Sequence, residues 1–375
     1  MDNCIYDNRT GNETVDKSLE LFQNNYVPLH GYISVIICVM GIFMNAANII
    51  VLTRRNMVTS INVILTWLAV ADNLKMIDYL IFVVKFYILK DPNLKLHNTH
   101  NIHFARYLLF HASFALVCHN TSVWLTVSVA MFRFLYIWFP VKGSAFCTVK
   151  KAKICVAIVY VSVAIFCVPN YVTNFLKVKQ PLNSSSNTSC RLVYTVDMID
   201  RDEPIFAFNT YIQAILAKIV PCVLLTVLTV LLIYAMHQAY QKRKLLKSQG
   251  LDHDARRHHE HNRTTGMLVA VVVLFLLVEL PFGILTLLVE FIRGTFQTEV
   301  YDKVADFHEL LALCNNAVNF LLYCSMSKQF RDTFISIFCR CIPEQRYRVV
   351  STLAVAEQNH TPETNTRGTT LEHYV

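Results

Sequence analysis

Residues 267–291 read MLVAVVVLFLLVELPFGILTLLVEF, and only Glu279 and Glu290 carry a charge within this stretch. A helix needs about 20 predominantly apolar residues to cross the hydrocarbon core of a bilayer. Soluble domains rarely contain an apolar run of this length, because so few of its residues can face water. The stretch therefore predicts a transmembrane helix.

Six further stretches on either side have the length and apolar content of a span. With the quoted run, the spans that we predict are 29–53, 61–89, 104–139, 152–176, 208–240, 265–292 and 304–326. The composition agrees, since 54% of the residues are hydrophobic and 16% are charged, against roughly 25% charged in a soluble domain. The predicted fold class is an all-α membrane protein with a seven-transmembrane helix bundle.

Charge and sequons predict the orientation. With the N-terminus outside, the inner loops and tail hold 19 Lys and Arg residues and the outer segments hold 10, as the positive-inside rule requires. Four Asn-x-Ser/Thr sequons fall in two segments that are then both extracellular: Asn8, Asn12, Asn183 and Asn187. We expect a glycosylated plasma-membrane protein with a cytoplasmic C-terminus. Most of its net charge of +8 falls in loops on one side of the membrane, so the charge does not indicate a nucleic-acid partner.

The chain is expected to have four parts. These are an extracellular segment at 1–28, the bundle at 29–326, an amphipathic helix on the inner membrane surface at 327–341, and a disordered cytoplasmic tail at 342–375. The amphipathic helix is predicted from phenylalanines at helical spacing beside basic residues, and it is followed by Cys339 and Cys341, candidates for palmitoylation. Threonines of the tail are candidates for phosphorylation and arrestin recruitment.

Polar side chains recur inside the apolar spans in a fixed order. The first span contains MNAANIIVL, the second LTWLAVADNL, the third ends in MFRFLYIWFP, and the seventh contains NNAVNFLLYCSMSKQF. Pro169, Pro221 and Pro281 lie inside the fourth, fifth and sixth spans, where proline removes a backbone hydrogen bond and bends a helix. Such polar groups are costly in lipid and usually functional, although they also hold helices together at about 1 kcal/mol or less each.

At these residues the chain resembles the rhodopsin-like G-protein-coupled receptors, over about residues 29–341. Asn45 and Asp72 match conserved polar positions of the family's first two helices, and Arg133 matches the arginine of its Asp-Arg-Tyr motif. Asn319 and Tyr323 match the ends of its Asn-Pro-x-x-Tyr motif. The resemblance implies that these five residues form the switch through which outward movement of helix six admits a heterotrimeric G protein. A snorkelling arginine is the alternative for Arg133.

The same resemblance implies an allosteric sodium ion and no other cofactor. Asp72, Ser122, Asn315 and Asn319 match the family positions around that ion, which would favour the inactive state by population shift. The alternative is a hydrogen-bond network without sodium, with Lys75 as an internal counter-ion to Asp72.

More narrowly, the chain is similar to invertebrate myosuppressin and FMRFamide-type neuropeptide receptors, in segments such as HGYISVIICVMG (30–41) and NFLLYCSMSKQFR (319–331). This implies an amidated peptide ending in Arg-Phe-amide and, as G protein, the inhibitory type. Such a ligand needs a carboxylate for its guanidinium and apolar walls for its ring. We favour Asp78 and Glu279, although Lys75, Lys218 or His111 would compete for them. Weaker candidates are Glu290, Asp306 and Glu309 as carboxylates, and Phe282 and His308 as wall residues.

Four positions depart from the family pattern. Phe132 replaces the acidic residue before the arginine, Phe320 replaces the proline of the seventh-helix motif, and Glu279 replaces a tryptophan. Leu108 stands where a cysteine usually starts a bridge to the second outer loop. A Cys4–Cys190 bridge is our hypothesis in its place, and free thiols are the alternative.

Other classes of membrane protein require residues or repeats that this sequence does not contain. An opsin needs a lysine where Leu313 stands, and a monoamine receptor needs an aspartate in the outer third helix, which reads RYLLFHASFALVCHN. A channel or transporter should show an internal repeat or paired broken helices. No phosphate loop, zinc motif or nucleophile constellation suggests an enzyme. An orphan or non-peptide receptor of the same family remains an alternative.

Overall fold

The structure is a computed structural model that describes residues 17–91, 94–139, 143, 145–179, 192–200, 202–248, 272–274, 276–289, 291–292 and 296–338. The chain divides into two units, Met1–Arg331 and Asp332–Val375. Several predicted sites lie outside the described residues: Cys4, Asn8, Asn12, Asn183, Asn187, Cys190, Glu290, Cys339, Cys341 and the tail.

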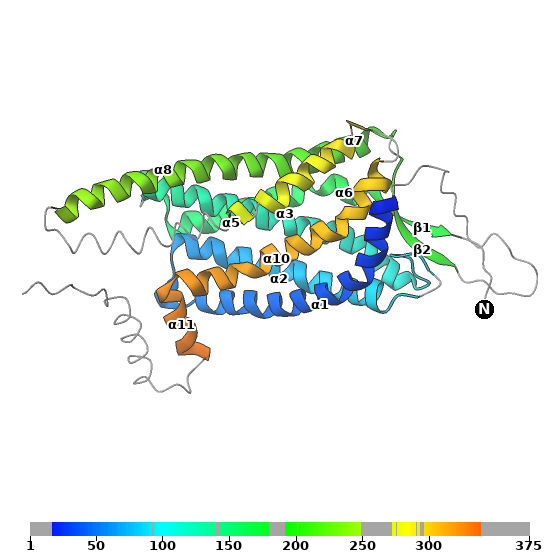
Figure 1. Ribbon diagram of the computed structural model, residues 1–375, viewed down its shortest axis with the longest axis horizontal. Helices are drawn as coiled ribbons and strands as arrows, with labels where there is room; N and C mark the ends of the chain where they lie inside the picture. The colour runs from blue at the N-terminus through cyan, green and yellow to red at the C-terminus, as the bar shows by residue number, and fades with distance from the viewer. Residues whose placement is uncertain are drawn as a thin grey trace, which may run out of the picture. The chain divides into compact units, whose positions relative to one another are not determined.

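Within the described ranges, the first unit contains seven helical spans (Figure 1). The first five spans are α1 (Lys17–Leu52), α2 (Ser60–Val83), α3 (Ile102–Trp138), α5 (Val149–Phe166) with α6 (Val168–Thr173), and α7 (Pro204–Ile212) with α8 (Val220–Ser248). The sixth span is Val272–Val289 and the seventh is α10 (Asp302–Met326). A short 3-10 turn, η1 (Arg55–Met57), joins α1 to α2.

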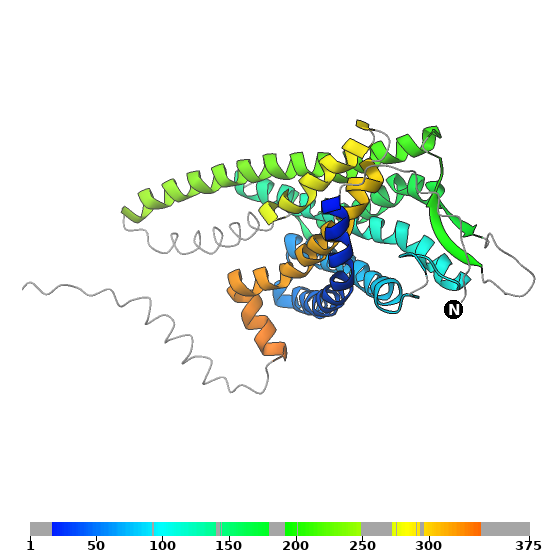
Figure 2. The same cartoon turned by 45° about the vertical axis from the view of Figure 1, so that its right-hand side comes forward.

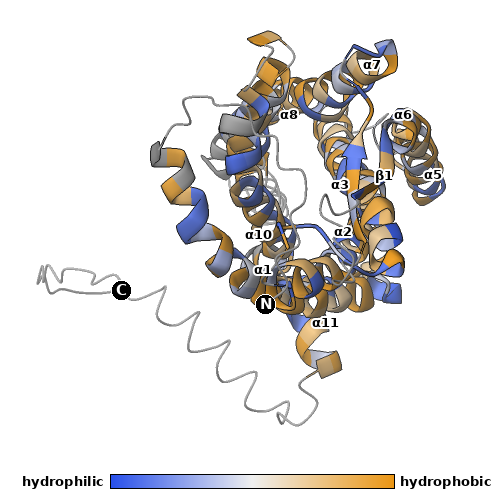
Figure 3. Cartoon of the chain, turned by 90° about the vertical axis from the view of Figure 1, so that its right-hand side faces the viewer, coloured by the Kyte–Doolittle hydropathy of each residue, from blue (hydrophilic) through white to orange (hydrophobic). Residues whose placement is uncertain are grey.

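Five of these spans are long and apolar enough to cross a bilayer by composition alone. The other two, α2 and α10, carry more polar residues and do not meet this criterion by themselves. The helices consist largely of hydrophobic residues (Figure 3), and side chains such as Phe43, Ile165 and Leu277 stay 65–70% exposed, as lipid contact requires. By contrast α2 contains Asp72, Lys75 and Asp78, all at most 5% exposed. The charges of α2 therefore face the interior of the bundle and not lipid.

Wide π-helical turns interrupt three spans. They are η2 (Val84–Ile88) after α2, η3 (Gln213–Ile219) between α7 and α8, and η4 (Gln297–Tyr301) before α10. Pro221 follows η3 and lacks the backbone N–H that would hold the preceding turn in α geometry, which accounts for the widened helix there. Pro169 similarly lies in the first turn of α6, where the fourth span breaks after Cys167.

A two-stranded hairpin is the one described departure from an all-helical fold. β1 (Asn174–Lys179) pairs antiparallel with β2 (Val193–Met198), and Asn174 lies opposite Met198. The prediction that the fourth span continues to 176 is thus wrong, because the chain becomes a strand after Thr173 and exchanges ladder hydrogen bonds with β2. Figures 1 and 2 show the hairpin and α7 at the same end of the bundle as the start of α1; we call this the hairpin end.

The first helix begins earlier than predicted, whereas the last two helices agree with the predicted secondary structure. Helix α1 begins at Lys17, so part of the segment predicted as an extracellular tail is helical. Helix α10 runs without a break from Asp302 to Met326, in keeping with Phe320 in place of the family's proline. A separate helix, α11 (Lys328–Phe338), follows it; that this helix lies on the membrane surface stays a prediction.

Candidate functional site

A cavity of about 420 Å³ opens among the spans in the hairpin half of the bundle. Its size falls within the usual range of roughly 300–1,000 Å³ for small-ligand sites. Its wall comes from the second to the seventh spans and the first loop. The lining residues include Lys75, Tyr87, His97, His111, His119, Asn170, Lys218, Phe282, Tyr301, Asp306, His308 and Glu309.

The cavity divides the predicted ligand residues into two groups. Phe282, His308 and Glu309 line it, as does the weaker candidate Asp306. The two favoured carboxylates, those of Asp78 and Glu279, are not among its described lining residues. Both are buried and held by other side chains, so the structure does not place them where a ligand in the cavity would meet them first.

Asp78 is bound to α3. The Nδ1 atom of His111 lies 2.7 Å from Asp78 Oδ2, and the hydroxyl of Tyr107 donates to Asp78 Oδ1 at 3.0 Å. The His111 ring stacks on Phe82 at a centroid distance of 4.1 Å. His111, one of the three residues expected to compete for the favoured carboxylates, thus pairs with Asp78. Its carboxylate fastens α2 to α3.

Glu279 is the centre of a buried polar cluster. Lys218 Nζ lies 2.5 Å from Glu279 Oε2, and His119 Nε2 lies 3.3 Å from the same oxygen. Glu279 is 1% exposed. Gly283, one turn later on the sixth span, permits this approach, because a Cβ built there would lie 2.9 Å from the Cβ of Lys218. The fifth and sixth spans therefore approach each other closely beside the Lys218–Glu279 pair.

Lys75 extends this cluster to the seventh span. Its Nζ lies 3.0 Å from Glu309 Oε1 and 3.4 Å from His119 Nδ1. The chain of contacts Glu309–Lys75–His119–Glu279–Lys218 thus crosses five spans with two cations and two carboxylates. Opposite charges in equal number allow such groups to be buried without an uncompensated charge. Lys75 pairs with Glu309 and does not contact Asp72 among the described interactions.

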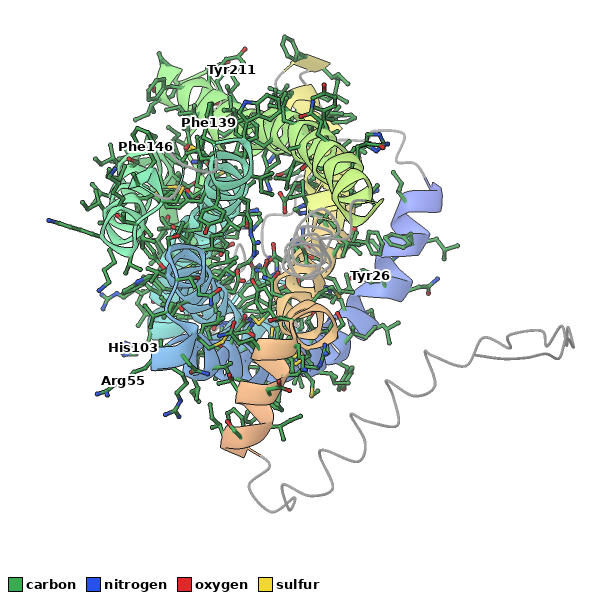
Figure 4. The ribbon with its side chains drawn as sticks, turned by 90° about the vertical axis from the view of Figure 1, so that its left-hand side faces the viewer. Tyr26, Arg55, His103, Phe139, Phe146 and Tyr211 are labelled. Atoms are coloured by element: carbon green, nitrogen blue, oxygen red, sulfur yellow. The ribbon has the colours of Figure 1, made fainter. Side chains whose placement is uncertain are left out.

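The aromatic wall includes residues that the sequence did not indicate. The rings of Phe282 and His308 stack at 3.7 Å between centroids, and Tyr301 packs on Phe282 at 4.8 Å. Across the cavity, the hydroxyl of Tyr87 donates to Asp306 Oδ1 at 2.7 Å. Tyr26, which Figure 4 labels on α1, reaches the backbone oxygen of Asp306 at 3.5 Å. The walls therefore combine flat apolar faces with the carboxylates of α10.

His97 lies in the first loop at the edge of this cavity. It has a left-handed backbone with φ of 66°, which non-glycine residues adopt uncommonly. Its Nε2 lies 3.3 Å from the Tyr87 hydroxyl. Burial lowers the pKa of His97 to about 4, although the nearby Asp306 carboxylate opposes this shift. The imidazole is consequently neutral at physiological pH.

Three of the four predicted sodium ligands form one polar cluster. The Ser122 hydroxyl donates to Asp72 Oδ1 at 2.6 Å, and Asn319 Nδ2 lies 3.3 Å from Asp72 Oδ2. Asn315 makes no hydrogen bond to Asp72 among the described residues. Asn45, on α1, donates instead to the backbone oxygen of Asn316 at 3.4 Å. Hydrogen bonds through these groups connect α2 with α3 and α1 with α10.

At the other end of the bundle, a cavity of about 290 Å³ contains both Arg133 and Tyr323 on its wall. Arg133 Nε has no hydrogen-bond partner among the described residues, and the preceding Phe132 is 6% exposed and apolar. The structure thus brings together two of the predicted switch residues. The exposed Arg55 of η1, labelled in Figure 4, lies at the same end outside this cavity.

Comparisons with known proteins agree with this architecture. The family described as serpentine type 7TM GPCR chemoreceptor Srw matches residues 32–341. The G-protein coupled receptor dmsr-1 of Caenorhabditis elegans is 30% identical, over 84% of this chain and 69% of that protein. The sex peptide receptor of Drosophila melanogaster is 28% identical over 87% and 75%, and the FMRFamide receptor of the same organism is 26% identical over 85% and 55%. The chain therefore belongs to the Srw family of seven-transmembrane G-protein-coupled receptors, and it is a multi-pass membrane receptor and not an enzyme.

Proposed function

We propose that this protein is a plasma-membrane receptor for a small neuropeptide ending in Arg-Phe-amide, and that the 420 Å³ cavity binds that end of the peptide. The hairpin end of the bundle then faces the extracellular side. One observation carries the proposal: the same cavity wall holds two carboxylates, of Asp306 and Glu309, and the stacked rings of Phe282 and His308. A relative named FMRFamide receptor supports the ligand class.

Asp306 is the first partner that we propose for the ligand's guanidinium. Glu309 already pairs with Lys75 at 3.0 Å, whereas Asp306 is held by the neutral hydroxyl of Tyr87. A guanidinium that replaced this neutral donor would form a stronger, charge-assisted hydrogen bond. Asp78 and Glu279, which the sequence favoured, then have a structural role: Asp78 joins α2 to α3, and Glu279 joins the sixth span to the fifth.

The ligand assignment is tested by G-protein activation in cells, with a panel of amidated peptides and their free-acid counterparts. Arg-Phe-amide peptides should activate the receptor, and the free acids should be weaker because they add a carboxylate beside Asp306. Asp306→Asn should lower potency about tenfold or more, the usual effect of losing a charged hydrogen bond. Asp202→Asn, outside the cavity, is the matched control. Ion flux in place of G-protein activation would instead favour a channel.

For the opposite end, we propose that Arg133 and Tyr323 form the G-protein switch. The cavity that they share would admit the C-terminal helix of the G protein, a helix-in-groove contact, once the sixth span moves outward; subfamily resemblance favours the inhibitory type. Arg133→Ala should abolish G-protein activation while peptide binding persists. Arg55→Ala, an exposed arginine nearby, should keep both. Loss of peptide binding in the first variant would contradict the assignment.

We further propose a sodium ion beside Asp72. Carboxylate, hydroxyl and amide oxygens are hard ligands of the kind that such cations prefer, and Ser122 and Asn319 each lie within hydrogen-bond distance of Asp72. The ion would stabilise the inactive arrangement. Glycosylation of the N-terminal segment, palmitoylation after α11 and arrestin recruitment by the tail stay predictions.

A further inference from the structure

A second cavity, of about 680 Å³, lies in the first loop. It adjoins the 420 Å³ cavity described above, which we call the ligand cavity. The wall of the second cavity runs from the end of α2 to the start of α3 and includes Lys85, Lys90, Asp91, Lys95 and His97. His97 is the one described lining residue that this cavity shares with the cavity containing Asp306 and Glu309. We call the second cavity the loop cavity.

The loop cavity has an excess of positive charge. Three lysines, Lys85, Lys90 and Lys95, stand against one carboxylate, that of Asp91. Lys85 Nζ lies 4.5 Å above the centre of the Phe104 ring, a cation–π contact that fixes its position. Lys90 and Lys95 are exposed. In the ligand cavity, Lys75 and Lys218 are paired with Glu309 and Glu279, whereas Asp306 is held by the neutral hydroxyl of Tyr87. The two cavities therefore favour opposite ends of a dipolar ligand.

His97 joins the two cavities, because it is part of both walls. On the side of the ligand cavity its Nε2 approaches the Tyr87 hydroxyl, which donates to Asp306. On the other side its ring packs edge-on against Phe86, with 6.3 Å between centroids. The two cavities therefore adjoin at His97.

The end of this loop next to α3 is anchored to β2, to the residue before β2 and to α3 itself. Thr99 exchanges two backbone hydrogen bonds with Tyr194 of β2, at 3.1 and 2.8 Å. His100 Nδ1 lies 2.8 Å from the backbone oxygen of Leu192, and Asn101 caps α3 by accepting from the His103 backbone N–H at 2.8 Å. Such a wall is ordered before a ligand arrives, which limits the entropy lost on binding.

We propose that the loop cavity binds acidic residues that precede the Arg-Phe-amide end of the peptide. The inference rests on the proposed function and deepens it: the receptor recognises a dipolar peptide, with its cationic amidated end beside Asp306 and its anionic N-terminal part beside Lys90 and Lys95. Charges at such a rim act mainly on association rate and selectivity, and their effect weakens with salt.

The test compares three synthetic peptides that share one Arg-Phe-amide end and carry no extension, a two-aspartate extension or a two-lysine extension. G-protein activation is measured on the full-length receptor and on Lys90→Glu/Lys95→Glu. The wild type should prefer the acidic extension over the basic one by about tenfold, and the preference should shrink in high salt. The double variant should reverse the order and respond normally to the peptide without an extension. Lys179→Glu, on β1 outside the loop cavity, should leave the order unchanged.

The outcomes separate the inference from the function on which it rests. If the peptides activate the wild type equally, or if Lys179→Glu alters the order as much as the double variant, the loop cavity has no such role and the receptor assignment survives. If the double variant loses its response to the peptide without an extension, the lysines serve the fold or a lipid headgroup, and the inference fails. If no Arg-Phe-amide peptide activates the wild type, the proposed function itself is wrong.

Discussion

Lys218 Nζ lies 2.5 Å from Glu279 Oε2, and this contact joins the widened turn of the fifth span to the sixth span. Both side chains are nearly inaccessible. By resemblance, Glu279 stands where rhodopsin-like receptors have a tryptophan. An ion pair thus occupies the place of an aromatic ring, next to the helix whose movement the proposed switch requires.

Breaking the pair on one side should destabilise the receptor. Lys218→Met leaves Glu279 buried with only histidine neighbours, and we expect the free energy of unfolding to fall by about 3 kcal/mol, the usual effect of removing one partner of a buried ion pair. Lys218→Met/Glu279→Leu should recover most of that loss, because no uncompensated charge remains. Thermal unfolding of the purified receptor measures both variants. Additive losses in the double variant would mean that the two residues do not interact.

Gly283 should be intolerant of even one methyl group. A Cβ there meets the Cβ of Lys218 at 2.9 Å, so Gly283→Ala forces the fifth and sixth spans apart. We expect a loss of about 1–3 kcal/mol, typical of overpacking, although alanine is the better helix former. Leu277→Ala on the lipid-facing side of the same span is the control and should change little. An unaltered or raised unfolding temperature for Gly283→Ala would contradict the close approach.

The first loop should weaken as pH falls. The pKa of His97 is about 4 in the folded loop and near 6.5 in an unfolded chain, so the unfolded chain binds more protons between these values. Stability is therefore lost as pH falls through 6.5 towards 4, by at most about 2 kcal/mol between pH 7.5 and 5.

The variant His97→Asn isolates this effect, because asparagine tolerates the left-handed backbone and does not titrate. Unfolding temperatures measured across this pH range should depend less on pH in His97→Asn than in the wild type. The exposed His103, at the start of α3, supplies the control His103→Asn, which should behave as the wild type does. A pH dependence that persists in His97→Asn would assign it to other groups.

Sodium should lower agonist affinity if the ion binds beside Asp72. Replacing sodium by N-methyl-D-glucamine at equal ionic strength should raise affinity in the wild type, because the inactive state loses its ligand. Asp72→Asn should show no difference between the two cations. Equal agonist affinity in both media for the wild type would leave the Ser122–Asp72–Asn319 contacts as a hydrogen-bond network only.

The helical spans and the proximity of Arg133 to Tyr323 follow well from sequence, for a simple physical reason. Apolar length predicts most of the spans, and a family motif fixes where Arg133 and Tyr323 fall along their helices. Since both motifs end at the same depth in the membrane, the residues meet in one cavity. Burial of the charges on α2 was likewise predictable, because lipid contact would be too costly for them.

The wall of the ligand cavity was harder to predict, because it depends on how each helix is rotated. Tyr87, Lys218 and Tyr301 lie in the π-helical turns η2, η3 and η4. Each such turn inserts a residue and shifts every later side chain around the helix. Regular 3.6-residue spacing therefore assigns these residues to wrong faces. His97 was missed for a related reason, since its left-handed backbone is set by tertiary contacts.

The partners of α2 have a consequence for how the protein is made. Asp72, Lys75 and Asp78 contact Ser122, His119 and His111 on α3, and Glu309 and Asn319 on α10. While the chain is still emerging from the ribosome, α10 does not yet exist, and Lys75 lacks its carboxylate partner Glu309, which makes α2 costly to hold in lipid. We expect the second helix to integrate stably only after the seventh is made, so nascent chains truncated before α10 should remain bound at the translocon and be degraded.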